Sequence, residues 1–107
     1  MRFEAPERAL ELICLLRPLV RVIRRHDPKL VTQIRDAANS TASCLAEGND
    51  RVGRDRVHLW RVALTSAEEV RMELRQAEAW GYVRHAETEL ALNKVDHVIR
   101  IISKLLR

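Results

Sequence analysis

Apolar residues recur along this chain at three- and four-residue intervals, the spacing of one face of an α-helix. Pro6 and Pro28 suit the first turn of a helix, because that turn leaves the missing proline N–H without a partner anyway. Asp27 is a typical N-cap, and we expect Gly48 to end a helix in the left-handed conformation. The pattern predicts four helices, over residues 6–25, 28–47, 54–80 and 86–107.

The links between these segments are short, and no repeat or low-complexity tract divides the chain. Four amphipathic helices joined by short links predict an all-α fold, an antiparallel up-down-up-down four-helix bundle. With 107 residues, the chain is expected to form one domain spanning 1–107. Its aromatic content of 4% predicts an aliphatic core.

Several classes of chemistry have no signature in the chain. There is no apolar run of membrane-spanning length, and residues 1–6 lack a signal-peptide pattern, so we expect a cytoplasmic protein without membrane contact. Cys14 and Cys44 lie in apolar helical segments and are expected to be reduced and buried. Without a metal-ligand spacing, a glycine-rich phosphate loop or a nucleophile motif, we expect no metal, no cofactor and no enzyme activity.

Arginine dominates the basic residues. Lys and Arg together number 19 against 15 Asp and Glu, a net charge of +4, yet only Lys29, Lys94 and Lys104 are lysines. The planar guanidinium fork suits phosphate and carboxylate groups. A GC-rich genome would produce the same arginine excess, so composition alone does not choose between function and codon bias.

The positions of the arginines suggest function. One group falls at intervals of four, three and one along the first helix, on one side, and another surrounds the start of the third helix. Such stripes could hold nucleic-acid phosphates, or they could be solvated faces paired with carboxylates of this chain or of another subunit. The candidate nucleic-acid-binding residues are Arg17, Arg21, Arg24, Arg25, Arg51, Arg54, Arg56 and Arg61.

Four polar residues lie near the packed faces of the second and third helices. Ser40, Glu47, Ser66 and Glu69 are predicted to form a structural polar network between these helices. The alternative is a carboxylate pair for acid–base catalysis, which would need a cleft and a partner group that the sequence does not indicate.

The two tryptophans have different settings. Trp60 is in register with the apolar stripe of the third helix, which favours the core or an interface. Trp80, beside Gly81 and Tyr82 at a helix end, could contact a partner or close the bundle, and either ring could in principle stack on bases.

The middle of the chain carries a set of short motifs: QIRDAANST at 33–41 and LAEG at 45–48, followed by Ala63, Ser66, Glu69, Leu74, Ala77, Gly81 and Tyr82. Their order and spacing resemble those of the 23S rRNA intervening-sequence proteins and of the related accessory proteins of diversity-generating retroelements. The resemblance implies a homo-oligomer, a pentameric ring, with an accessory or RNA-associated role. Its retroelement branch also implies a reverse transcriptase as partner.

Together, these observations predict a non-enzymatic homo-oligomeric accessory protein that binds nucleic acid or a nucleic-acid enzyme through arginine-rich surfaces. The alternative is a structural or adaptor oligomer whose arginines contact protein alone.

Overall fold

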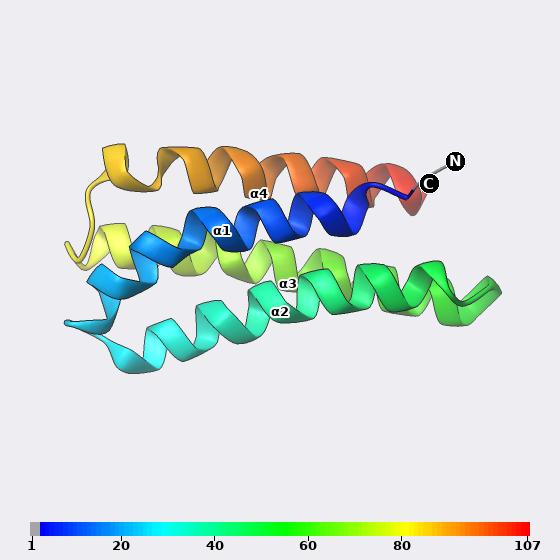
Figure 1. The fold of residues 1–107 in the computed structure, drawn as a ribbon, viewed down its shortest axis with the longest axis horizontal. Helices are drawn as coiled ribbons and strands as arrows, with labels where there is room; N and C mark the ends of the chain where they lie inside the picture. The colour runs from blue at the N-terminus through cyan, green and yellow to red at the C-terminus, as the bar shows by residue number, and fades with distance from the viewer. Residues whose placement is uncertain (1–2) are drawn as a thin grey trace.

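The computed structural model describes residues 3–107 as four α-helices, with no strand in that range. Met1 and Arg2 lie outside the described residues. The helices are α1 (Ala5–Arg24), α2 (Pro28–Asn49), α3 (Gly53–Ala79) and α4 (His85–Leu105). Successive helices run in opposite directions, so the α1–α2 and α3–α4 links share one end of the bundle, here called the two-link end (Figure 1). The predicted all-α four-helix bundle is confirmed.

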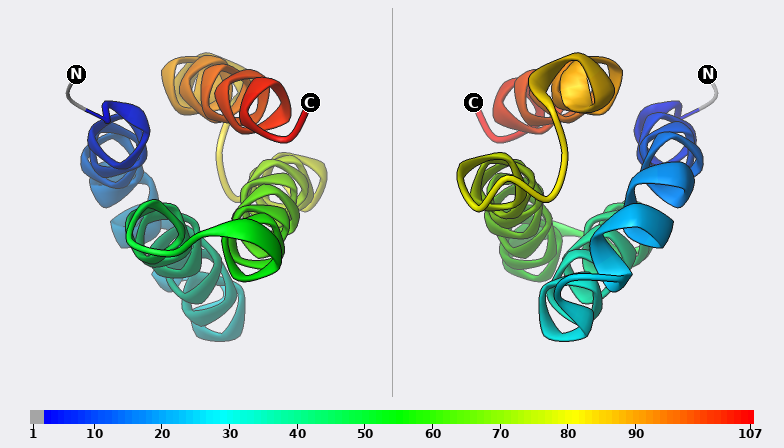
Figure 2. Two further views of the ribbon diagram at one scale, coloured as in Figure 1. Left: turned by 90° about the vertical axis from the view of Figure 1, so that its right-hand side faces the viewer. Right: turned by 90° about the vertical axis from the view of Figure 1, so that its left-hand side faces the viewer.

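The helices sit at four corners, and each packs against its neighbours in sequence while α1 also packs against α4 (Figure 2). Burial of one apolar stripe per helix drives this arrangement, because it removes aliphatic surface from water. The core is aliphatic, as predicted. Its largest fully buried apolar side chains are Leu12, Ile23, Ile34, Leu45, Val70, Leu74, Val95, Val98 and Ile102.

Gly48 does not end α2, contrary to the prediction. The helix continues to Asn49, and positive φ angles within residues 3–107 occur at Gly53 (60°) and Gly81 (80°) instead. Gly48 is buried against Trp60, where an added Cβ would lie 2.5 Å from ring atoms Cδ1 and Nε1. Glycine is therefore needed at this position for close packing between α2 and α3 and not for a left-handed turn.

Two of the predicted helix starts are confirmed, and one of the predicted buried residues is exposed. Pro6 lies in the first turn of α1, and the Asp27 carboxylate caps α2 by accepting a hydrogen bond from the Leu30 N–H at 3.0 Å. Pro18 lies within α1, which remains one continuous helix through it. The predicted burial of both cysteines is wrong for Cys14, which is exposed because it lies outside the buried stripe of α1.

Within residues 3–107, no helix combines the length and apolar character needed to cross a membrane.

Candidate nucleic-acid interface

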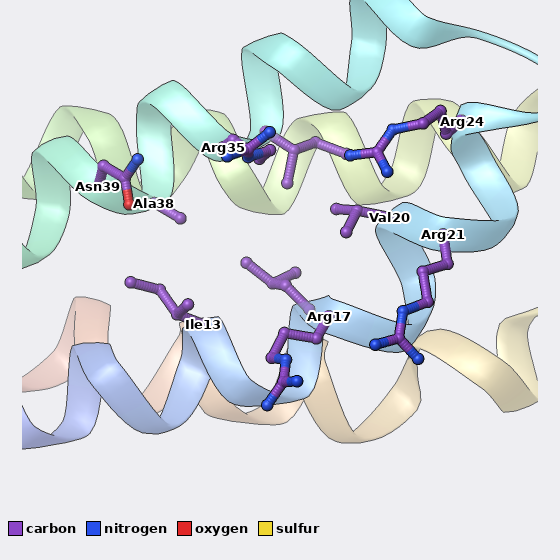
Figure 3. A pocket seen from close by; sticks show the side chains of 10 residues that line it. Ile13, Arg17, Val20, Arg21, Arg24, Arg35, Ala38 and Asn39 are labelled. Atoms are coloured by element: carbon purple, nitrogen blue, oxygen red, sulfur yellow. The ribbon is translucent and has the colours of Figure 1, made fainter.

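A groove of about 400 Å³ runs between α1 and α2 and is rimmed by four arginines (Figure 3). Arg17, Arg21 and Arg24 come from α1, and Arg35 comes from α2 on the opposite side. We call this feature the arginine groove. Its other lining residues are mostly apolar: Ile13, Leu16, Val20, Ile34, Ala38 and Asn39.

Helix geometry places the three α1 arginines on one side of the helix. Arg17, Arg21 and Arg24 are four and three residues apart, so their side chains emerge from one face of α1. A rise of 1.5 Å per residue separates Arg17 from Arg24 by about 10 Å along the helix axis. The α1 side of the groove therefore carries three arginines in a row, and Arg35 adds a fourth from α2 across the groove. Arg35 was not among the predicted residues, because only tertiary packing brings α2 alongside α1.

None of these four arginines forms an ion pair with any residue in the described range 3–107. Other basic residues do find carboxylates: Arg8 pairs with Glu4 and Glu11, Arg71 with Asp96, Arg84 with Glu87, and Lys94 with Glu11. The arginine groove is thus a concentration of positive charge that this chain does not neutralise by ion pairing within residues 3–107.

The remaining predicted arginines lie elsewhere. Arg25 is exposed at the end of α1, next to the groove in sequence. Arg51, Arg54 and Arg61 are exposed in or near the α2–α3 link, at the end opposite the two-link end. Because α3 lies diagonally across the bundle from α1, the two arginine groups are not side by side (Figure 2).

Arg56 binds the carboxyl end of α2. Its Nε donates to the Gly48 carbonyl and one terminal nitrogen donates to the Asn49 carbonyl, each at 3.0 Å. The guanidinium also lies 5.2 Å from the Trp60 ring centroid, a cation–π distance. Arg56 caps the carboxyl end of α2, where helix carbonyls lack partners, and two of its five N–H donors are engaged there.

A second groove, of about 570 Å³, separates α2 from α3 and is acidic. The Ser66 hydroxyl donates to the Ser40 hydroxyl across it at 2.9 Å, so two of the four residues of the predicted network are bonded. Glu69 is exposed on the rim of the groove. Glu47 is exposed near the end of α2 and does not line the groove, because it lies about 10 Å further along the helix axis than Ser40, the last α2 residue of the groove.

Asp36 and Glu73 complete this acidic groove. Burial, followed by repulsion from Glu69 and Asp36, raises the pKa of Glu73 from 4.5 to about 7. Its Oε1 atom is buried and has no hydrogen-bond partner in the described part of the chain. The i,i+4 pair Glu69 and Glu73 was a sequence signal for this repulsion. A polyanion would be repelled here, so the faces on either side of α2 carry opposite charge.

The fold and its grooves define a small antiparallel four-helix bundle with a basic groove on one side of α2 and an acidic groove on the other. Residues 4–104 match the model of the 23S rRNA-intervening sequence protein family, and the chain belongs to this family.

A similar solved structure supports the fold. It is a crystal structure from Bacteroides thetaiotaomicron, described as a protein with unknown function from the S23 ribosomal protein family. The TM-score is 0.86 at 16% sequence identity, covering 96% of this chain and 98% of that chain. A comparison with curated proteins finds no match.

Proposed function

We propose that this protein is a non-enzymatic, self-assembling accessory protein that binds nucleic acid through the arginine groove. The observation that carries the proposal is the cluster of Arg17, Arg21, Arg24 and Arg35, which have no ion-pair partner among residues 3–107. The name of its family points to an rRNA context, which supports RNA as a ligand. The resemblance to retroelement accessory proteins supports a reverse transcriptase as a protein partner and a pentameric ring as the assembly.

Phosphate neutralisation predicts how steeply the binding constant should fall as the salt concentration rises. Each phosphate contact releases condensed counterions, so the logarithm of the binding constant falls by about 0.7 to 0.9 per contact for each tenfold rise in salt. Four guanidinium contacts therefore predict a slope of roughly −2.8 to −3.6. Between 50 and 200 mM salt, such a slope weakens binding by about 50- to 150-fold.

The test is a salt titration of binding by fluorescence anisotropy, with labelled RNA and DNA oligonucleotides, single-stranded and duplex. The variant Arg17→Ala/Arg21→Ala should reduce the slope by about 1.4 to 1.8 units and weaken binding at low salt. The matched control is Arg75→Ala/Arg100→Ala, which removes the same charge from exposed positions outside the groove. Equal effects of the two double variants would contradict the proposal.

The separation of charge on the two sides of α2 favours a second candidate, an adaptor oligomer without nucleic acid. The basic face of one copy could contact the acidic face of the next copy. Such head-to-tail contacts produce a ring when the rotation between successive copies closes on itself. Light-scattering mass, with absorbance at 260 and 280 nm recorded across the same peak, separates the candidates. An oligomer that carries nucleic acid at low salt and releases it at high salt supports the first candidate. An oligomer that is free of nucleic acid at low salt supports the second.

A further inference from the structure

Three aromatic rings form a stack at the two-link end of the bundle. The ring centroids of His26 and Tyr82 are 5.0 Å apart with an interplanar angle of 6°, and those of Tyr82 and Trp80 are 6.4 Å apart with an angle of 14°. The stack joins the α1–α2 link to the end of α3 and the start of the α3–α4 link. His26 lies more than 50 positions in sequence from Trp80 and Tyr82, so the fold brings it onto the stack.

Backbone hydrogen bonds hold the stack in place. The Tyr82 N–H donates to the Ala77 carbonyl and the Gly81 N–H donates to the Glu78 carbonyl, each at 2.9 Å. With Gly81 at a φ of 80°, this is the Schellman ending of a helix, which fixes the backbone between Trp80 and Tyr82. The Tyr82 hydroxyl also donates to the Asp27 carboxylate at 3.3 Å, which ties the stack to the α1–α2 link.

Trp80 is the open end of this stack. It is 73% exposed, whereas Trp60 is 8% exposed. Its ring stacks on Tyr82, and much of the rest of the indole surface faces solvent. An exposed indole on a rigid support is a ready-made surface on which another flat ring can stack, at little cost in conformational entropy.

Basic residues connect the arginine groove to the stack along the chain. Arg24 lines the arginine groove, and Arg25 and His26 follow it directly in sequence, so this end of the groove and the stack are both at the two-link end. Of the nearby carboxylates, Glu87 is paired with Arg84, whereas Asp27 and Glu78 accept hydrogen bonds from the neutral donors Tyr82, Leu30 and Thr88 and keep their charge. His26 and Tyr82 lie between Arg24 and Trp80 in this arrangement, so a strand with its phosphates in the arginine groove would pass these two rings before its base meets Trp80.

We propose that Trp80 is a base-stacking site for an unpaired nucleotide of a single strand whose phosphates occupy the arginine groove. The inference rests on the proposed nucleic-acid function and adds a preference to it, because base stacking requires an unpaired base and duplex ends offer few. Every base has an aromatic face, so the preference is for single strands and not for a particular sequence.

The experiment compares three ligands on the full chain: a 12-nucleotide oligo(U), a blunt RNA duplex of equal phosphate count, and inorganic polyphosphate. Trp80→Ala should weaken oligo(U) binding by about 5- to 150-fold, the range for loss of one stacked base. It should leave polyphosphate binding and the salt slope unchanged, since neither depends on a base. Trp80→Phe should retain most of the affinity, and oligo(U) should quench tryptophan fluorescence in the wild type but not in Trp80→Ala.

The outcomes separate this inference from the proposed function. If Trp80→Ala binds oligo(U) as the wild type does, while Arg17→Ala/Arg21→Ala loses both oligo(U) and polyphosphate, the stacking site is refuted and the groove stands. A lower light-scattering mass of Trp80→Ala at unchanged oligo(U) affinity would assign Trp80 to a protein contact and also refute stacking. If the wild type binds none of the three ligands, both proposals fail. Circular dichroism of each variant checks that it is folded.

Discussion

The contact between Gly48 and Trp60 allows a sharp test of how α2 and α3 pack. In Gly48→Ala, two effects oppose each other. Alanine favours a helix over glycine by about 1 kcal/mol, and Gly48 has ordinary helical geometry, so local propensity predicts stabilisation. However, the new Cβ would lie 2.5 Å from Cδ1 and Nε1 of Trp60, well inside contact distance.

The indole has little room to move away. Its Nε1 donates to the Leu45 carbonyl at 3.3 Å, Phe3 stacks on the ring with centroids 5.7 Å apart, and the Arg56 guanidinium lies 5.2 Å from its centroid. Overpacking costs about 1–3 kcal/mol, and loss of the hydrogen bond adds about 1 kcal/mol. After the gain in propensity, we expect a net destabilisation of roughly 1–3 kcal/mol, a fall in Tm of about 5–15 °C.

Thermal and urea unfolding followed by circular dichroism measure this effect. Asn49→Ala is the matched control, because it changes an exposed position one residue further along α2 and should alter stability by less than about 0.5 kcal/mol. In a Trp60→Leu background the ring is absent, so the penalty of Gly48→Ala should largely disappear. A higher Tm for Gly48→Ala, or the same loss in both backgrounds, would refute the argument.

Two further predictions concern the acidic groove. Burial and like charge raise the pKa of Glu73 from 4.5 to about 7, so ionisation opposes folding and stability should fall as pH rises across this interval. Glu73→Gln should make the free energy of unfolding depend less on pH, and it should be more stable than the wild type at pH 8. Urea unfolding of both proteins at pH 5 and pH 8 measures this. The same change in stability between the two pH values for both proteins would contradict the prediction. Ser66→Ala should cost about 1 kcal/mol by removing the donor to Ser40, whereas Ser40→Ala/Ser66→Ala should be closer to the wild type. If the losses of Ser40→Ala and Ser66→Ala simply add in the double variant, the bond contributes nothing.

The sequence indicated the fold because helical periodicity is a local property. The spacing of Leu12, Leu16, Leu19 and Ile23 predicts the buried face of α1 whatever packs against it. The proline and aspartate signals near residues 6 and 27 predicted helix starts for the same local reason. Gly48 misled the prediction because two causes favour glycine, a left-handed turn and a close approach, and the sequence does not distinguish them.

The site depended on which helices became neighbours, and no periodicity within one helix contains that information. Arg17, Arg21 and Arg24 were found from their spacing, but Arg35 joins them only because α1 packs against α2. Arg56 shares the composition signal of the other arginines, yet the end of α2 and the Trp60 ring occupy it. The sequence by itself determined the helices and their charged faces, since both follow from contacts a few residues apart. The tertiary structure alone decided which charges share a groove and which rings stack, because those contacts join residues far apart in the chain.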